Sequence, residues 1–94
     1  MNKDLIILGS TGSIGLSTLN AIKKKKNFKI KILSTNSNIK KIYNQALEFN
    51  VKNIIIYDTS KLYKYSYLFK KKKIKVFSSI TEALKKNKKK VYFT

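Results

Sequence analysis

The chain of 94 residues contains no cysteine, histidine, arginine, proline or tryptophan, and only three glycines. Without cysteine it can form no disulfide framework and offers no thiolate nucleophile. Without histidine it lacks the commonest general base and zinc ligand. The apolar run nearest the start, Leu5–Leu8, is far too short to span a bilayer or to serve as the core of a signal peptide. We therefore expect one small cytoplasmic domain with no membrane segment.

Acidic residues are also scarce, because 4 acids face 22 basic residues, all of them lysine, and the formal net charge is +18. Such an excess favours binding to polyanions, and a basic nucleic-acid-binding domain is one hypothesis for the function. Tyr63 and Tyr67, interleaved with Lys61 and Lys64, could stack bases in such a domain. The lysines gather at the ends of expected helices and in turns, however, and form no single stripe. We therefore expect non-specific polyanion binding from charge alone, and the tyrosines more simply cover an amphipathic helix.

Apolar runs typical of strands alternate with patterns typical of helices from one end of the chain to the other. Strands are expected at residues 5–8, 28–33, 53–57, 74–77 and 91–93. Helices are expected after a glycine-rich turn up to about Asn27, at 38–49, from an N-cap within 58–60 to the lysines 70–73, and over Ala83 and Leu84. This order predicts an α/β fold: a Rossmann-like parallel sheet with helices on both faces, incomplete because the chain holds one half-fold.

The spacing of apolar residues also predicts which sides are buried. Residues 28–33 alternate apolar residues with lysines, which predicts a strand at an edge or a half-covered position of the sheet. In the first helix the apolar side is expected to consist of Ile14, Leu16, Leu19 and Ile22. Lysines at 85–90 predict a polar turn before the last strand.

All three glycines fall within residues 9–15, between the first expected strand and the first expected helix. Gly9 would permit a tight turn, Gly12 the close approach of a pyrophosphate, and Gly15 the close packing of the helix on the sheet. The start of the helix would offer N–H groups and a partial positive charge to that anion. Leu16 follows where a Walker loop has lysine, so a Walker loop is excluded. The alternative is a tight turn that binds nothing.

The end of the second strand normally carries an acidic residue that binds the adenosine ribose of NAD. Here no acid lies between Asp4 and Glu48. The segment 34–38 holds hydroxyl and amide side chains instead, with Lys40 and Lys41 just beyond it. A 2′-phosphate would be attracted by these cations, whereas a carboxylate would repel it. The sequence therefore favours NADP over NAD, although a polar loop without a ligand has the same composition.

No set of residues qualifies as a catalytic centre or a metal site. The four acids, Asp4, Glu48, Asp58 and Glu82, are far apart in the pattern. Glu82 also has a structural explanation, because Ser79 to Glu82 has the form of a capping box.

Three stretches resemble a known family. Residues 5–15, LIILGSTGSIG, followed by Ser17-Thr18-Leu19, closely resemble the N-terminus of the 1-deoxy-D-xylulose 5-phosphate reductoisomerases. Residues 45–49, QALEF, resemble a stretch in the second helix of that family. Semialdehyde and acyl-phosphate dehydrogenases have a similar glycine loop, but residues 13–15 followed by 17–19 argue against them.

The resemblance implies an NADPH-dependent oxidoreductase that converts 1-deoxy-D-xylulose 5-phosphate to 2-C-methyl-D-erythritol 4-phosphate in isoprenoid precursor biosynthesis. In the family an N-terminal NADPH-binding domain, here residues 1–94, precedes a catalytic domain that binds Mn²⁺ or Mg²⁺, and the enzyme is expected to be a homodimer. The metal ligands, substrate-phosphate site and lid of the family lie beyond the position that matches Thr94. This chain is therefore expected to bind the cofactor and to lack the catalytic residues.

The resemblance also implies which residues touch the cofactor. The phosphates would be contacted by Thr11, Gly12, Ser13 and Ile14, in the turn that Gly9 and Gly15 shape. The adenosine end would be held by Asn36, Ser37 and Asn38. The family usually has Gly-Lys-Asn at these last positions, so a turn glycine and a phosphate-binding lysine are replaced. Asparagine is the non-glycine residue best suited to a left-handed turn, and Lys40 or Lys41 could supply charge.

Overall fold

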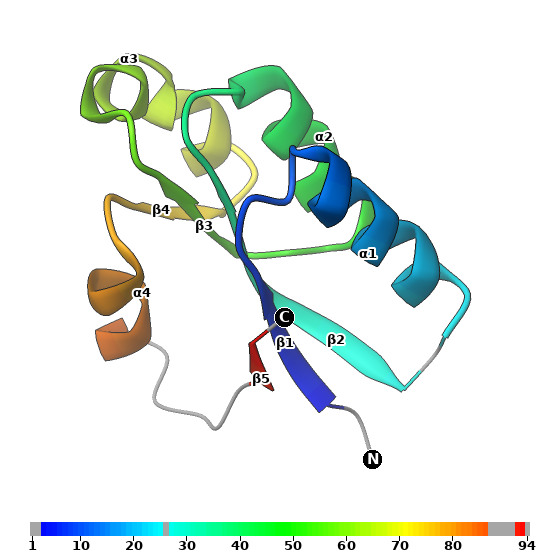
Figure 1. Cartoon of the computed structure of the whole chain (residues 1–94). Helices are drawn as coiled ribbons and strands as arrows, with labels where there is room; N and C mark the ends of the chain where they lie inside the picture. The colour runs from blue at the N-terminus through cyan, green and yellow to red at the C-terminus, as the bar shows by residue number, and fades with distance from the viewer. Residues whose placement is uncertain (1–2, 26, 87–91, 94) are drawn as a thin grey trace.

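The computed structural model describes residues 3–25, 27–86 and 92–93, and within them strands and helices alternate (Figure 1). The strands are β1 (Lys3–Ile7), β2 (Phe28–Thr35), β3 (Asn53–Ile56), β4 (Lys75–Phe77) and β5 (Tyr92–Phe93). The helices are α1 (Ser13–Lys23), α2 (Ile39–Glu48), α3 (Thr59–Lys70) and α4 (Ile80–Lys86). Every strand pairing is parallel, which confirms the expected α/β fold.

The order of strands in the sheet is β4-β3-β2-β1-β5. The chain adds β2, β3 and β4 in turn on one side of β1. Strand β5 then pairs with β1 on its other side. The chain therefore changes direction across the sheet between β1 and β5. In open parallel sheets, ligands bind beyond the carboxyl ends of the strands at such a switch point. The loop that follows β1 occupies this position.

Helices cover both faces of the sheet, with α1, α2 and α3 on one face and α4 on the other (Figure 1). Ile7, Leu33 and Ile54 belong to the core under the first three helices, with Phe69 of α3 fully buried among them. The core beside α4 is made of Ile6, Ile32, Ile55, Phe77 and Ala83. Since consecutive strand residues point to opposite faces, uninterrupted apolar runs are what a sheet covered on both sides requires.

The expected edge position of the second strand is wrong, because β2 is the central strand of the sheet. Its alternation is broken by a bulge: Leu5 of β1 pairs with Ile30 and the next residue, Ile6, pairs with Ile32. Lys31 is the extra residue. Ile30 and Ile32 consequently lie in opposite cores, although a regular strand would place both on one face.

The apolar side of α1 also differs from expectation. Ile14 is 83% exposed, whereas Gly15 and Leu19 are buried and Ile22 packs against the core. Gly15, Leu19 and Ile22 follow the spacing i, i+4, i+7 of a single helix face, and Ile14 lies about 100° away from Gly15 around the axis. Ile14 therefore points away from the sheet at the start of the helix.

The other boundaries agree within a few residues, with one exception at α4. Lys85 and Lys86 continue that helix, where a turn was expected. The remainder of the expected turn, residues 87–90, and the first residue of the last expected strand, Val91, lie outside the described residues. Among the residues that are described, no helix has the length and apolar character needed to cross a membrane.

Candidate functional site

The loop between β1 and α1 makes a tight turn at Gly9. Gly9 has φ +66°, in the left-handed region where a side chain is strained, and the N–H of Gly12 donates to the Gly9 carbonyl oxygen at 3.0 Å. The tight turn predicted at Gly9 is thus confirmed. It brings the chain from the end of β1 to the start of α1 at the carboxyl edge of the sheet.

Gly15 lets helix α1 touch the backbone of this turn. A Cβ atom at Gly15 would clash with the Gly9 carbonyl oxygen and would lie 2.5 Å from the Cα atom of Ser10. These are backbone atoms, which cannot rotate away as a flexible side chain can. Gly15 is therefore required for packing, as predicted, but its partner is the turn and not the sheet.

Gly12 stands in a different environment. A Cβ atom there would meet only the Gly9 carbonyl oxygen, at 3.5 Å, an ordinary contact, and the residue is exposed. Gly12 is the N-cap of α1, no side chain caps this helix, and its first turn contains no acid. The first N–H groups of a helix have no partner within it and carry a partial positive charge. The exposed space beside Gly12 therefore lies next to a partial positive charge, and packing does not explain the absence of a side chain there.

A buried polar network holds the turn in place. The Ser34 hydroxyl accepts a hydrogen bond from the Gly9 N–H at 2.8 Å, and the Ser34 carbonyl accepts one from the Ser10 N–H at 2.9 Å. From α2, the Gln45 amide nitrogen donates to the Ser10 carbonyl at 2.9 Å, and its oxygen accepts from the Ser10 hydroxyl at 2.8 Å. Sequence reasoning gave Gln45 no role, and its place in the QALEF stretch was the only signal of one.

Replacing Gln45 by leucine should lower the free energy of unfolding by about 2 kcal/mol, because the buried Ser10 carbonyl would lose its donor. Urea denaturation followed by circular dichroism measures the effect. The matched control is Asn44→Leu, which places the same residue at an exposed neighbouring position of α2. Equal urea concentrations at the midpoint of unfolding for the two variants would contradict the role assigned to Gln45.

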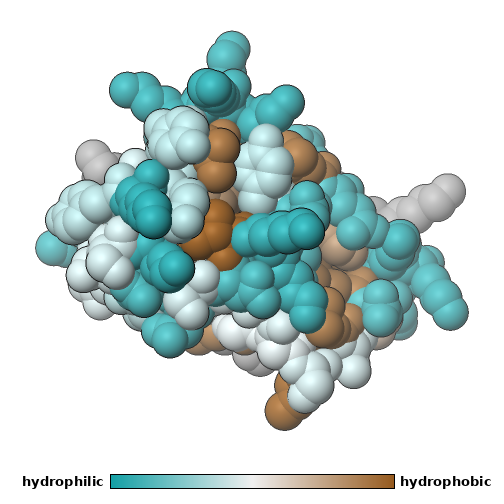
Figure 2. Space-filling model, turned by 90° about the horizontal axis from the view of Figure 1, so that it is seen from above, coloured by the Kyte–Doolittle hydropathy of each residue, from teal (hydrophilic) through white to brown (hydrophobic). Residues whose placement is uncertain are grey.

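A second contact joins the turn to the end of β2. The hydroxyl oxygens of Thr11 and Thr35 are 2.7 Å apart, and Thr35 Oγ1 also accepts from the N–H of Asn38 at 3.2 Å. The structure thus brings the turn and the segment 36–38, which are far apart in the sequence, to the same edge of the sheet. Figure 2 views the molecule from this end and shows hydrophobic surface exposed between hydrophilic residues.

Asn36, Ser37 and Asn38 are exposed and lead from β2 into α2. Asn38 is the N-cap of α2, and its side-chain oxygen accepts from the N–H of Lys41 at 3.2 Å. The expected left-handed turn at Asn36 is wrong, because among the described non-glycine residues only Asn50 and Lys73 have positive φ. Instead the Asn36 carbonyl accepts from the Asp58 N–H at 2.9 Å, which continues the pairing of β2 with β3. The backbone at position 36 therefore does not need glycine.

Three of the four acidic side chains serve structural roles. Glu48 pairs with Lys23 at 2.7 Å, Glu82 accepts from the Ser78 N–H at 3.4 Å, and Asp58 caps α3. The pKa of Asp58 is lowered by hydrogen bonds from the Ser60 hydroxyl and the Lys61 N–H. In the described part of the chain no three acids gather where they could hold a metal ion. The described acids therefore do not fit a divalent metal ion.

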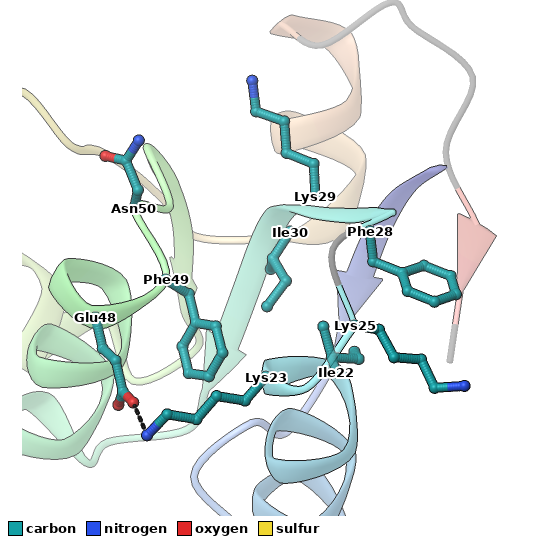
Figure 3. A pocket seen from close by; sticks show the side chains of 9 residues that line it. All are labelled: Ile22, Lys23, Lys25, Phe28, Lys29, Ile30, Glu48, Phe49 and Asn50. Carbon is teal, nitrogen blue, oxygen red and sulfur yellow. Dashed lines mark ion pairs between the residues drawn. The ribbon is translucent and has the colours of Figure 1, made fainter. Parts of the chain in front are cut away.

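A hollow of about 290 Å³ lies at the other end of the sheet, where α1 and α2 end and β2 begins. Figure 3 shows the Lys23–Glu48 ion pair joining these two helices at one side of the hollow. Ile22, Phe28 and Phe49 supply apolar surface. Because it lies at the amino end of β2, this hollow is not part of the candidate cofactor site.

Comparisons with known proteins find relatives of one kind. The relative from Pelagibacter ubique, a 1-deoxy-D-xylulose 5-phosphate reductoisomerase, is 47% identical over 78 residues, 82% of this chain and 20% of the relative. The Thermotoga maritima reductoisomerase is 44% identical over 54 residues, 57% of this chain and 14% of the relative. This chain thus spans about a fifth or less of the length of these relatives.

Solved structures show the same fold. The Zymomonas mobilis reductoisomerase in complex with NADPH has a TM-score of 0.79 at 24% identity, over 90% of this chain and 23% of that one. A reductoisomerase in complex with NADPH, fosmidomycin and magnesium has a TM-score of 0.77 at 28% identity, over 88% and 21%. The family model of 1-deoxy-D-xylulose 5-phosphate reductoisomerase matches residues 5–91. With this match over nearly its whole length, the chain belongs to the 1-deoxy-D-xylulose 5-phosphate reductoisomerase family.

Proposed function

We propose that residues 1–94 form an NADPH-binding domain of a 1-deoxy-D-xylulose 5-phosphate reductoisomerase. The observation that carries this proposal is the uncapped start of α1 beside Gly12, where a turn held by buried hydrogen bonds leaves open space for a pyrophosphate. Two structural neighbours from the same family are complexes with NADPH.

The predicted cofactor-binding residues form two groups, one for the phosphates and one for the adenosine ribose. The N–H groups of Thr11, Ser13 and Ile14 would donate hydrogen bonds to cofactor phosphates lying beside Gly12, whose own N–H is bonded to Gly9, and the exposed side chain of Ile14 would contact the cofactor where it leaves the turn. Asn36, Ser37 and Asn38 would face the adenosine ribose. The Thr11 hydroxyl is engaged with Thr35, so its N–H is the more available donor.

In the reaction itself the chain would supply cofactor binding. NADPH, when bound, provides the hydride that reduces the rearranged sugar phosphate. The metal site and the catalytic groups would come from the catalytic domain of such an enzyme, and a second copy of the chain would complete a homodimer. We place this enzyme in the cytoplasm, where NADPH is available. Non-specific binding to polyanions would accompany this function because of the charge of +18.

The chain should bind NADPH more tightly than NADH, because no acid lies at residues 34–38 and Lys40 and Lys41 follow. We expect a preference of at least about tenfold, since a 2′-phosphate adds charge-assisted hydrogen bonds. Isothermal titration of the chain with both dinucleotides tests this. Tighter binding of NADH would overturn the assignment of the cofactor, and binding of neither would overturn the proposed function.

A further inference from the structure

A second hollow, of about 410 Å³, opens beside the segment 36–38, between α2 and α3. Ser37 and Asn38 form its edge toward the candidate cofactor site. Two half-buried tyrosines, Tyr43 of α2 and Tyr65 of α3, line it, and Lys61 comes from the first turn of α3. The hollow therefore continues the edge of the sheet where the adenosine end of a dinucleotide would lie.

We propose that Lys40 and Lys61, one from each helix beside this hollow, bind the 2′-phosphate of NADPH and set the preference for NADPH over NADH. This inference rests on the proposed function. Residues 34–38 contain no cation, so the loop itself offers no charge to a phosphate. Lys40 and Lys61 line the same hollow as Ser37 and can supply positive charge from the two flanking helices.

The surroundings of Lys40 and Lys61 favour the binding of an anion. Neither forms an ion pair in the described part of the chain, where Lys23 with Glu48 is the pair observed. The Lys61 ammonium lies 5.8 Å from the centre of the Tyr65 ring, along the wall of the hollow. Helices α2 and α3 both begin at this edge, and their N-termini add partial positive charge.

One carboxylate, Asp58, lies near Lys61 and opposes binding of an anion, because its hydrogen bonds lower its pKa and keep it ionised. Its oxygen accepts from the Ser60 hydroxyl at 2.7 Å and from the N–H groups of Ser60 and Lys61 at 3.1 and 3.3 Å. Asp58 does not line the hollow. The charge balance beside Ser37 is therefore two lysines against one ionised carboxylate, which leaves a net positive charge.

The test measures how the 94-residue chain binds adenosine 2′,5′-bisphosphate and AMP, two probes that differ by the 2′-phosphate. Lys61→Gln and Lys40→Gln should each weaken binding of the bisphosphate about tenfold, the loss expected for one charge-assisted contact, and change binding of AMP less than about twofold. The matched control is Lys64→Gln. Lys64 also lies over the Tyr65 ring, at 5.4 Å, but does not line the hollow.

The outcomes distinguish failure of this inference from failure of the proposed function. If Lys64→Gln weakens the bisphosphate as much as Lys61→Gln does, the effect is general electrostatic attraction and the inference is wrong. If the unaltered chain binds NADPH but neither Lys40→Gln nor Lys61→Gln changes its preference over NADH, the inference fails and the proposed function stands. If the unaltered chain binds neither NADPH nor the bisphosphate, both fail. Circular dichroism of each variant checks that the fold is retained.

Discussion

Replacing Gly15 by alanine is expected to lower the free energy of unfolding by about 3 kcal/mol, the upper end of the usual cost of overpacking. The added Cβ would meet the backbone of Gly9 and Ser10, so helix α1 would have to move away from the turn. Small domains are stable by only about 5–15 kcal/mol, so this is a large loss. In most helices the same substitution would stabilise by about 1 kcal/mol, which makes the sign diagnostic.

Urea denaturation measures the change, and Gly12→Ala is the control for Gly15→Ala. A Cβ at Gly12 makes one contact, at 3.5 Å, so this variant should unfold close to the unaltered chain. A higher midpoint for Gly15→Ala than for the unaltered chain would show that α1 does not pack on the turn as described.

Replacing Gly12 by valine should weaken NADPH binding by about a hundredfold, or ~2.7 kcal/mol, and leave the fold intact. The backbone at Gly12 has φ −84° and ψ 175°, an extended conformation that a β-branched residue adopts readily. The branched side chain would occupy the open space through which a pyrophosphate reaches the first N–H groups of α1. The loss corresponds to one or two charge-assisted hydrogen bonds.

Isothermal titration with NADPH gives the affinity, and the matched control is Asn20→Val, at an exposed position of the same helix. The control should bind as the unaltered chain does, although valine lowers the helix propensity there. A folded Gly12→Val variant with unchanged affinity would place the cofactor elsewhere.

Regular repeats made most of the fold predictable from the sequence. The i, i+3, i+4 pattern of α2 located that helix within one residue at each end, since Asn38 and Phe49 are its caps. The apolar runs of β1 and β3 located strands that are buried on both faces. The turn at Gly9 followed from the order of strand, glycines and helix, because a left-handed residue is a local requirement.

The features that could not be predicted depend on contacts between distant segments. A bulge at Lys31 is set by pairing with β1, and nothing within residues 28–33 distinguishes it from regular alternation. Gln45 is a polar residue on a helix, which normally indicates exposure, and its burial becomes intelligible only when Ser10 is placed beside it. Lys61 gains a possible role only because α3 lies next to α2.

The bulge in β2 has a consequence for how the gene can change. Before the bulge, Ile30 belongs to the core under α1, α2 and α3. After the bulge, Ile32 lies in the core beside α4 and Leu33 lies under the other three helices. Deleting one codon at Lys31 would remove the extra residue and leave Ile30 and Ile32 adjacent, on the opposite faces that they already occupy. Ser34, which holds Gly9, belongs to the half that follows. Loss of Lys31 should therefore keep both cores and the hydrogen bond to Gly9, whereas loss of Ile32 would place Lys31 in the core beside α4.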